Sequence, residues 1–240
     1  MTKKSALGIF FKIPVLGKVK KRLAAEIGED EAFKAYGSML KATIENVSRL
    51  RGIDLYGFYE GEITSLNPTL ASDNPPNLLL EKVGATRNRG NEGGFEKGGI
   101  LEFLKKIPLY PQKGSNLGEK MYDAIKWLFN KKYKKISLIG SDSPDLPLTF
   151  IIDAFEKLDS YNLVIGPSED GGYYLIGMSK PYDRIFKNIK WGHDSVLKET
   201  ISNANAAGIS YFLLPEWYDI DDLNSLDRWR IKNPILHRKE

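Results

Sequence analysis

The sequence predicts an α/β domain whose mixed, mostly parallel sheet is flanked by helices on both faces. Two observations support this fold class. Short apolar runs typical of strands alternate along the chain with segments that place apolar residues at helical spacing. At 240 residues, of which 42% are hydrophobic, the chain is long enough for one large α/β domain with a full core. We therefore expect a single domain over residues 1–240.

The first part of the chain combines a long helix with short strands. In order, the expected elements are a strand at 6–11, helices at 18–27 and 29–50, and strands at 54–59 and 77–81. The long helix is predicted because Tyr36, Met39 and Leu40 belong to an apolar stripe at helical spacing. This stripe is expected to face the core.

The second part of the chain continues the alternation. The expected elements are a helix from 116, a strand at 135–139, a helix at 147–158, strands at 163–166 and 173–178, a helix at 193–207, a strand at 209–214 and a helix at 222–231. Pro147 fits the first turn of its helix, where no N–H is needed. The two strands around Gly171 and Gly172 are joined by a tight turn.

Residues 84–99 depart from this pattern. They read GATRNRGNEGGFEKGG and combine a high glycine content with charges of both signs, which predicts a flexible loop. Two interpretations stay open for this insertion: a solvated linker, or a lid over an active site.

Composition excludes several kinds of site. Cysteine is absent, which excludes a disulfide framework, a thiol nucleophile and a zinc–thiolate centre. His193 and His237 are the two histidines, so a metal would be held mostly by oxygen, which favours Mg²⁺, Mn²⁺ or Ca²⁺. The net charge of +4 mildly favours anionic ligands and is too small to indicate nucleic-acid binding.

Neither a membrane span nor a signal peptide is expected. No run approaches the roughly 18–20 apolar residues of a membrane-spanning helix. The apolar run near the N-terminus ends at Lys12, and no small-residue cleavage site follows it. The sequence therefore predicts a cytoplasmic protein and indicates no particular oligomeric state.

Positive charge is concentrated where the first strand leads into the first helix. Residues 10–23 read FFKIPVLGKVKKRL, turn at Gly17 and place Lys20 and Arg22 on the following helix. The N–H groups and dipole of a helix N-terminus attract phosphate, and nearby cations strengthen that attraction. The segment contains neither a Walker loop nor a G-x-G-x-x-G motif. A phosphate site and a solvated basic helix face both fit this pattern.

Two carboxylates follow the strand at 135–139, in the sequence GSDSPDL. In a doubly wound sheet ligands bind outside the carboxyl ends of the strands, where Asp142 lies beside small residues. Asp145 stands just before Pro147 and is interpreted as part of the cap of the next helix. Asp142 is therefore the functional candidate, although capping alone would explain both carboxylates.

Further acidic residues occur at two later turns. Asp170 projects from the turn in GPSEDGGYYLIG, where two glycines allow the backbone to approach a ligand closely. A hairpin needs such residues in any case, but a second oxygen donor is what a metal site at Asp142 requires. The literal D-x-D of residues 219–221 directly precedes the last helix and is interpreted as its cap.

Several motifs, taken in order, resemble those of one bacterial family. The pattern F-x-K-x-P-x-x-G-x-V-K-T-R-L appears here as FFKIPVLGKVKKRL, with Lys21 in place of Thr. It is followed by QKGSNLGEKM, in which Lys120 replaces Arg, and then by GSDSPDL, GPSEDGGYYLIG and a closing DIDDL segment. Over nearly its whole length the chain resembles the GT-A-like glycosyltransferases of the arsenosugar-biosynthesis and selenodomain-associated type, within the nucleotide-diphospho-sugar transferase superfamily.

The resemblance implies a GT-A fold in which Mg²⁺ or Mn²⁺ bridges the diphosphate of a nucleotide-sugar donor. It assigns Asp142 to the metal-binding position and Asp170 to the second acidic position. The nucleotide-binding residues that it implies are Phe11, Lys12, Lys20, Arg22, Asn116, Gly118 and Lys120. Asp170 and His193 are the candidate catalytic bases, and His193 also fits a helix N-terminus.

The expected activity is the transfer of a sugar from a nucleotide-diphosphate donor to a small-molecule acceptor. A metal and nearby cations neutralise a diphosphate leaving group, so the residues suit this chemistry. Two alternatives stay open. One is a nucleotidyltransferase of the guanylyltransferase type on the same fold, and the other is a nucleotide-binding protein without catalytic activity.

Overall fold

The computed structural model describes residues 4–62 and 104–232, which build a seven-stranded sheet of order β3-β2-β1-β4-β6-β5-β7. The strands are β1 (Ser5–Lys12), β2 (Ile53–Glu60), β3 (Leu109–Pro111), β4 (Lys135–Gly140), β5 (Leu163–Pro167), β6 (Tyr173–Met178) and β7 (Tyr211–Leu213). Strand β6 runs antiparallel to β4 and β5, and the other neighbouring strands are parallel. The predicted fold class, a mostly parallel sheet in an α/β protein, is confirmed.

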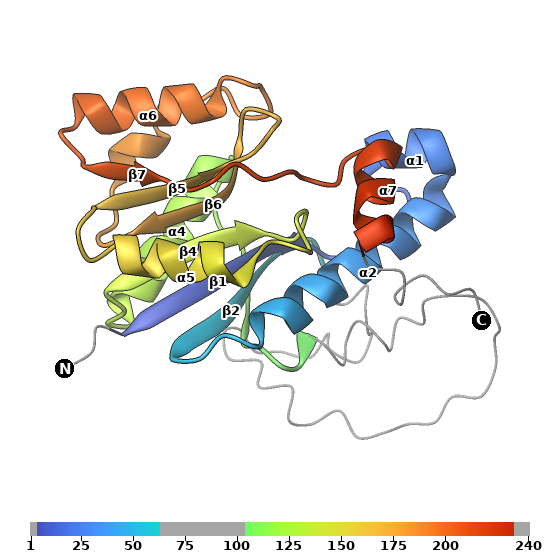
Figure 1. Cartoon of the computed structure of the whole chain (residues 1–240), viewed down its shortest axis with the longest axis horizontal. Helices are drawn as coiled ribbons and strands as arrows, with labels where there is room; N and C mark the ends of the chain where they lie inside the picture. The colour runs from blue at the N-terminus through green and yellow to red at the C-terminus, as the bar shows by residue number, and fades with distance from the viewer. Residues whose placement is uncertain (1–3, 63–103, 233–240) are drawn as a thin grey trace.

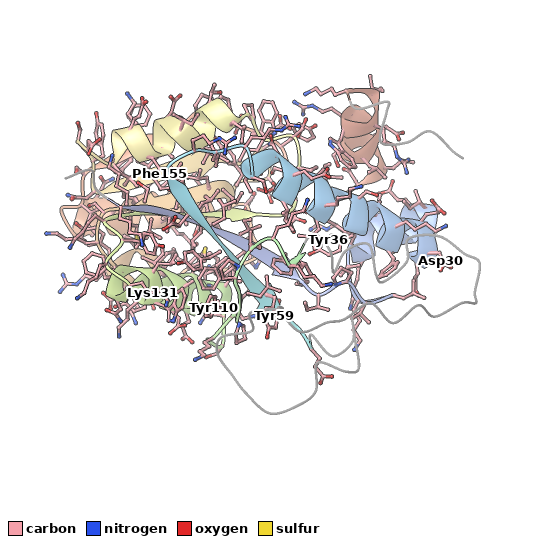
Figure 2. The ribbon with its side chains drawn as sticks, turned by 90° about the horizontal axis from the view of Figure 1, so that it is seen from below. Asp30, Tyr36, Tyr59, Tyr110, Lys131 and Phe155 are labelled. Carbon is pink, nitrogen blue, oxygen red and sulfur yellow. The ribbon has the colours of Figure 1, made fainter. Side chains whose placement is uncertain are left out.

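Helices cover both faces of the sheet (Figure 1). On one face lie α2 (Glu29–Val47) and α5 (Leu148–Lys157), and Leu40, Ile44 and Ile151 of these helices share one core with apolar residues of the sheet. On the other face lie α4 (Leu117–Asn130), the 3-10 helix η3 (Asp183–Phe186) and α6 (Val196–Ala206), with Ile125 and Ile185 in their core. Figure 2 shows the sheet between α5 and α4. Each fully buried aliphatic side chain in these cores stabilises the fold by roughly 1.5–3 kcal/mol.

A third, smaller core lies beside the carboxyl ends of the parallel strands. There α1 (Lys21–Ile27) and α7 (Leu223–Lys232) lie side by side at the start of α2 (Figure 1). Leu23, Met39, Leu226 and Trp229 are almost fully buried in this core. The chain reaches α7 by crossing the edge of the sheet, where the N–H of Ile220 donates to the carbonyl of Asp142 at 2.8 Å. The C-terminal segment is thereby brought to the loop after β4.

The structure shifts several predicted boundaries. Helix α1 begins at Lys21, because Lys20 adopts a left-handed conformation (φ 47°) that ends the preceding turn. Helix α6 begins at Val196, three residues after its predicted start. The expected strand at 77–81 and the glycine-rich insertion at 84–99 lie outside the described residues. Among the helices of the described ranges, none combines the length and apolar character needed to cross a membrane.

Candidate active site

A pocket of about 390 Å³ opens at the carboxyl ends of β1, β2 and β4. Its polar wall includes the side chains of Lys12, Lys20, Tyr36, Glu60, Gln112, Asp142 and Asp221. Its apolar wall comes largely from the sheet and from Leu117 and Met121 on α4. The carboxyl edge of a doubly wound sheet is where such proteins bind their ligands, so this pocket is the candidate active site.

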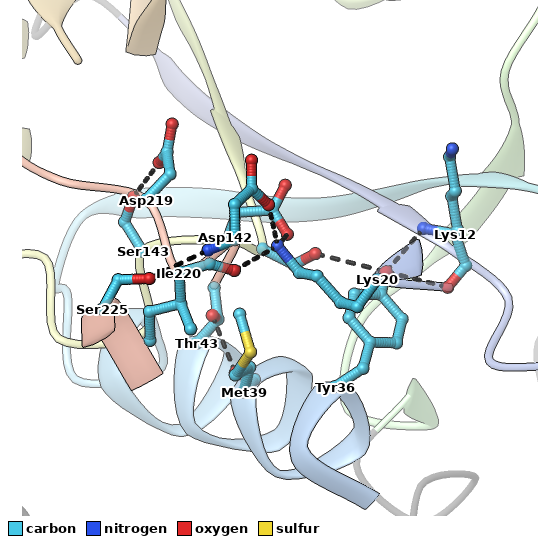
Figure 3. A network of polar contacts seen from close by, with 12 residues as sticks. Lys12, Lys20, Tyr36, Met39, Thr43, Asp142, Ser143, Asp219, Ile220 and Ser225 are labelled. Atoms are coloured by element: carbon cyan, nitrogen blue, oxygen red, sulfur yellow. Dashed lines mark hydrogen bonds and ion pairs between the residues drawn. The ribbon is translucent and has the colours of Figure 1, made fainter. Parts of the chain in front are cut away.

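Lys20 occupies the centre of the polar wall (Figure 3). Its Nζ lies 2.6 Å from Oδ1 of Asp142 and 2.7 Å from Oδ1 of Asp221, and it donates to the carbonyl oxygen of Ile220 at 2.5 Å. The three donors of the ammonium therefore have three acceptors. The side chain of Lys20 is 6% exposed, whereas those of Asp142 and Asp221 are about half exposed (45% and 46%) and face the pocket.

The two carboxylates keep Lys20 charged. Burial by itself would lower the pKa of the Lys20 ammonium, because a buried charge loses its hydration. The charges of Asp142 and Asp221, together with the hydrogen bonds that they accept, outweigh this effect and raise the pKa above its usual range. The pocket wall therefore carries a fixed positive charge enclosed by two negative ones.

Asp219 adds a partly buried carboxyl group beside this arrangement. Its Oδ1 accepts a hydrogen bond from Ser143 Oγ at 2.5 Å, and its Oδ2 accepts one from Ser168 Oγ at 2.7 Å (Figure 3 shows the first). Burial is the main cause that raises the pKa of Asp219 to about 6, and the charges of Asp142 and Asp170 raise it further against the two serine hydrogen bonds. Asp219 is thus poised between its ionised and neutral forms near neutral pH.

The interpretation of residues 219–221 as a helix cap is wrong. The cap of α7 is Asp222, whose Oδ1 accepts hydrogen bonds from the N–H of Ser225 at 2.8 Å and from its Oγ at 2.6 Å. Asp221 pairs with Lys20, and Asp219 lies between the loops after β4 and β5. Asp219, Asp221 and Asp222 cannot all reach the N-terminus of α7, and Asp222, which directly precedes the helix, is the residue that caps it.

Asp145 is structural, as expected, but it does not cap α5. That helix begins after Pro147 without a side-chain cap. Instead Asp145 accepts hydrogen bonds from Trp217 Nε1 at 3.3 Å and from the hydroxyl of Tyr218 at 2.6 Å. It therefore anchors the C-terminal segment that carries Asp219 and Asp221.

Asp170 lies at the rim of the arrangement. It is exposed, and its Oδ1 accepts a hydrogen bond from the N–H of Gly172 at 2.9 Å within the turn. Among the described residues it does not line the pocket, but its charge reaches Asp219, as does that of Asp142. The predicted metal ligands Asp142 and Asp170 are therefore both near Asp219. The sequence analysis did not assign Asp219 to the site.

Tyr36 holds the end of β1 beside the end of β4 (Figure 3). Its hydroxyl accepts a hydrogen bond from the N–H of Lys12 at 2.8 Å, donates to the carbonyl of Lys12 at 3.1 Å and lies 3.4 Å from Ser141 Oγ. Burial, followed by the charge of Asp142, raises the pKa of Tyr36 to about 12. The phenol is therefore neutral at physiological pH and fixes the backbone from which Lys12 projects.

The predicted nucleotide-binding residues divide into two groups. Phe11, Lys12 and Lys20 line the pocket, whereas Arg22 is exposed on α1 and lies outside the lining. Lys120 does not line the pocket itself, but its Nζ donates to Oε1 of the lining residue Glu60 at 2.6 Å. Nucleotide contact by these side chains stays a prediction.

Asn116 and Gly118 have structural functions at the start of α4. Oδ1 of Asn116 accepts a hydrogen bond from the N–H of Glu119 at 3.0 Å, which makes Asn116 the cap of the helix. Gly118 packs so closely against the ring of Trp191 that a Cβ there would overlap it. These contacts account for both residues without a ligand, and the lining residue between them is Leu117.

His193 is exposed in the turn before α6 and lies outside the lining of the pocket among the described residues. Its carbonyl accepts a hydrogen bond from the N–H of Val196 at 3.4 Å, so its backbone helps to start the helix. This turn packs against the Asp170 turn, where the N–H of Leu197 donates to the carbonyl of Gly171 at 2.9 Å. The two candidate bases therefore belong to adjoining loops, and their catalytic role stays a prediction.

Sequence reasoning missed three polar residues of the pocket wall besides Asp221. Tyr36 was assigned to the core face of its helix, and Glu60 and Gln112 were assigned no function. Glu60 ends β2 and Gln112 directly follows β3. The signal that could have identified them is their position at the carboxyl ends of parallel strands, beside Lys12 at the end of β1.

The carboxylates of the pocket fit a hard divalent cation that is coordinated by protein side chains and by substrate phosphates together. In the described part of the chain, no three Asp, Glu or His side chains are arranged as a complete metal cage. Asp142 and Asp221 nevertheless present carboxylate oxygens to the pocket, with Asp219 close by. Mg²⁺ is commonly held by one or two carboxylates together with substrate phosphates, and these residues match that pattern.

Comparisons with known proteins add the following findings. A family model described as "Uncharacterized protein conserved in bacteria (DUF2064)" matches residues 83–193, which include Asp142 and Asp170. No curated protein matches the sequence. A crystal structure from Desulfovibrio desulfuricans G20, provisionally described as a nucleotide-diphospho-sugar transferase, is 29% identical with a TM-score of 0.76, and the match covers 100% of this chain and 92% of that one.

Two nucleotide-handling enzymes share the architecture at low identity. The 4-diphosphocytidyl-2C-methyl-D-erythritol synthase of Anaerococcus prevotii is 11% identical with a TM-score of 0.55, covering 95% of this chain and 96% of that one. The CMP:2-keto-3-deoxy-manno-octonic acid synthetase, solved with CTP, is 6% identical with a TM-score of 0.53, covering 96% and 99%. The narrower resemblance to the arsenosugar and selenodomain type stays a prediction. The chain has the fold of the nucleotide-diphospho-sugar transferases.

Proposed function

We propose that this protein is a metal-dependent glycosyltransferase that moves a sugar from a nucleotide-diphosphate donor to a small acceptor. The observation that carries the proposal is the ammonium of Lys20 held between the carboxylates of Asp142 and Asp221 on the wall of the pocket. A diphosphate with its divalent cation needs positive charge for its oxygens and carboxylates for the metal. Both are supplied at the carboxyl edge of the sheet, and the likeness to the Desulfovibrio protein supports the assignment.

The reaction requires the leaving diphosphate to be stabilised. The bond between the anomeric carbon of the sugar and the β-phosphate oxygen breaks, and that carbon forms a bond to an acceptor oxygen. The acceptor gives up its proton, and the nucleoside diphosphate departs with the additional negative charge. Lys20 and Lys12 on the pocket wall stabilise this charge, and Tyr36 keeps the backbone of Lys12 in place.

Asp142 and Asp221, which line the pocket, are the residues that would hold Mg²⁺ or Mn²⁺. When bound, the cation neutralises charge on the donor diphosphate. The same two carboxylates contact Lys20 in the structure. We infer that Lys20 holds the two carboxylates in place at the pocket wall, where the metal would bind.

We assign the base that accepts the proton of the acceptor to the turns that carry Asp170 and His193. These turns adjoin each other and both residues are exposed, which leaves them accessible to a second substrate. In this proposal the acceptor approaches from these loops and the donor lies over the strand ends.

A second candidate function is nucleotidyl transfer, which the likeness to the two nucleotide-handling enzymes favours. In that reaction a substrate oxygen attacks the α-phosphate of a nucleoside triphosphate and pyrophosphate leaves. The cation and carboxylates described above would serve it equally well, because both reactions expel a phosphate leaving group.

The two reactions are separated by their products. The protein is incubated with Mn²⁺ and either a panel of nucleotide sugars or a panel of nucleoside triphosphates with sugar phosphates, and the products are resolved by chromatography. Sugar transfer or slow donor hydrolysis releases a nucleoside diphosphate, which is the expected result. Pyrophosphate release would assign nucleotidyl transfer, and binding without turnover would leave a nucleotide-binding protein.

A further inference from the structure

Three neighbouring strand ends place polar side chains on the face of the sheet that α4 covers. Phe10, Phe58 and Tyr110 form a row across this face, with ring centroids 5.5 Å apart for the first pair and 6.2 Å for the second. Alternate residues of a strand share a face, so the residues two positions later form the next row. That row consists of Lys12, Glu60 and Gln112, and all three line the pocket.

The order of this row follows from the strand register. Lys12 and Glu60 are direct partners in the parallel pairing of β1 with β2. Tyr59 and Pro111 are partners in the pairing of β2 with β3, and the N–H of Gln112 continues it by donating to the carbonyl of Tyr59 at 2.8 Å. The backbone positions of the row therefore run Lys12, Glu60, Gln112 across three adjacent strands, and the amide of Gln112 reaches back across β2 towards β1.

The orientation of the Gln112 amide is fixed by its surroundings. Its Nε2 donates to the carbonyl oxygen of Phe58 at 3.0 Å and to that of Phe11 at 3.3 Å. Because backbone carbonyls only accept, the nitrogen must face them, and both of its N–H groups are used. Oε1 receives no hydrogen bond from the described residues, so Gln112 offers the pocket an acceptor and no donor.

Glu60 supplies a second acceptor. Lys120 donates to its Oε1 at 2.6 Å, and this hydrogen bond is the main cause that lowers the pKa of Glu60, with the charge of Lys12 contributing. The carboxylate is therefore ionised at neutral pH and can only accept hydrogen bonds. Its side chain is 43% exposed, which leaves Oε2 accessible to a ligand.

We propose that this row recognises the base of the donor and that the base is guanine. The inference rests on the proposed function, because it concerns the nucleotide bound in the same pocket. Together the three side chains offer the pocket one donor, from Lys12, and two acceptors, from Glu60 and Gln112. The edge of guanine offers the complement of this set, one acceptor at O6 and two donors at N1–H and the 2-amino group.

The other bases fit this row less well. Uracil has one donor, N3–H, and two carbonyl oxygens, so one of the two acceptors of the row is left without a donor. Cytosine and adenine each have one amino group as a donor on this edge together with a ring nitrogen acceptor, so they also leave one acceptor of the row unmatched. A buried acceptor placed against an acceptor loses its hydrogen bond and repels, so each mismatch weakens binding.

The adjoining wall suits the flat faces of a base. Leu117 is 44% exposed, unusual for a leucine, and lines the pocket together with Met121 from the next turn of α4. Both lie on the side of the sheet that carries the row. A purine held by its edge against the row would cover this apolar surface.

The experiment is calorimetry of the full chain with GDP, IDP, UDP, CDP and ADP in the presence of Mg²⁺. We expect GDP to bind at least about tenfold more tightly than UDP, CDP or ADP, since each mismatch costs about one charged or neutral hydrogen bond. IDP lacks only the 2-amino group, and we expect it to bind about fivefold more weakly than GDP. Equal affinity for GDP and UDP, or tightest binding of CDP, would overturn the guanine assignment while leaving the proposed function intact.

Two variants test whether Gln112 recognises the 2-amino group of guanine. Gln112→Leu removes the acceptor and is expected to make GDP and IDP bind equally, whereas the adjacent exposed Lys113→Gln should keep the preference of the parent. Because Gln112 also ties two backbone carbonyls, the comparison of GDP with IDP on the parent decides the question if Gln112→Leu does not fold. Equal binding of GDP and IDP to the parent would contradict the role of Gln112. Failure of all five nucleotides to bind would refute the proposed function itself.

Discussion

The ammonium of Lys20 lies 2.6 Å from Oδ1 of Asp142, and this contact joins the loop after β1 to the loop after β4. The same ammonium reaches Asp221, 201 positions further along the chain. One buried side chain thus brings together the three segments that frame the polar wall of the pocket. Because its charge is enclosed by two carboxylates, Lys20 contributes to the stability of the site.

Lys20→Ala is expected to weaken the binding of nucleoside diphosphates and to flatten its dependence on salt, because a fixed cation of the pocket is lost. We also expect a loss of about 1–3 kcal/mol in the free energy of unfolding, since two half-exposed carboxylates then lack their partner. Calorimetry at several salt concentrations and urea unfolding measure the two effects. Lys21→Ala, at an exposed neighbouring position, is the control. Equal affinity of Lys20→Ala and the parent at low salt would mean that Lys20 does not contact the donor.

The raised pKa of Asp219 should make the free energy of unfolding depend on pH. Its pKa is raised in the folded chain, from an ordinary value of 3.8 to about 6. The unfolded chain releases this proton first, so the contribution of Asp219 to stability falls as the pH rises between these two values. Relative to Asp219→Asn, the parent should lose about 1–3 kcal/mol of unfolding free energy between pH 4 and pH 7.

Urea unfolding of both proteins across this pH range, with EDTA present, measures the difference. Asp222→Asn is a matched control of opposite sign, because hydrogen bonds from Ser225 lower the pKa of Asp222. Its contribution to stability is present at neutral pH and is lost as the pH falls. A difference between parent and Asp219→Asn that does not change with pH would show that the Asp219 carboxyl titrates normally.

Tyr36→Phe removes the hydroxyl that joins the backbone of Lys12 to Ser141. We expect a loss of about 1–3 kcal/mol in the free energy of unfolding, because the partly buried N–H of Lys12 is left without an acceptor. Tyr161→Phe, whose ring packs on Phe212, serves as the control for loss of a tyrosine hydroxyl elsewhere. Unfolding curves of the two variants that coincide would contradict a special role for the Tyr36 hydroxyl.

Local rules predicted many of the elements and turns of the fold. Asn116 caps α4 as its position before the apolar stripe indicates. Gly171 adopts φ 85°, and a Cβ there would overlap the carbonyl of Asp194, so the tight turn requires glycine. The cap of α4 and the turn conformation at Gly171 depend on residues that are close in sequence, whereas the contact with Asp194 is a tertiary one. Strand β3 was missed because three residues ending in proline carry too little periodicity to be recognised.

The parts of the site that escaped prediction depend on distant contacts. Asp221 satisfies the sequence rule for a helix cap as well as Asp222 does, and only its contact with Lys20 distinguishes them. The orientation of Gln112 is likewise set by the carbonyls of Phe11 and Phe58, on two other strands. Asp142 was identified because its position at a strand end is a property of the topology, which alternation in the sequence already indicates.

The central claim is that Asp142 takes part in metal-dependent binding of a nucleoside diphosphate, and a matched pair of variants tests it. Asp142→Asn preserves the shape of the side chain and removes the charge that the metal requires. Asp145→Asn, three residues on, weakens instead the anchor to Trp217 and Tyr218. Both variants are expected to lose stability, of the order of 1–3 kcal/mol, because Asp142→Asn also removes a charged partner of the buried Lys20 ammonium.

The measurement is calorimetry of the parent and both variants with GDP and with UDP, with and without Mn²⁺. We predict that Mn²⁺ strengthens nucleotide binding by the parent and by folded Asp145→Asn, and that Asp142→Asn loses this Mn²⁺-dependent gain, because a carboxylate ligand of the shared cation is missing. If Asp142→Asn binds the nucleotides with the same affinity and the same response to Mn²⁺ as the parent, the assignment of Asp142 to the metal is wrong.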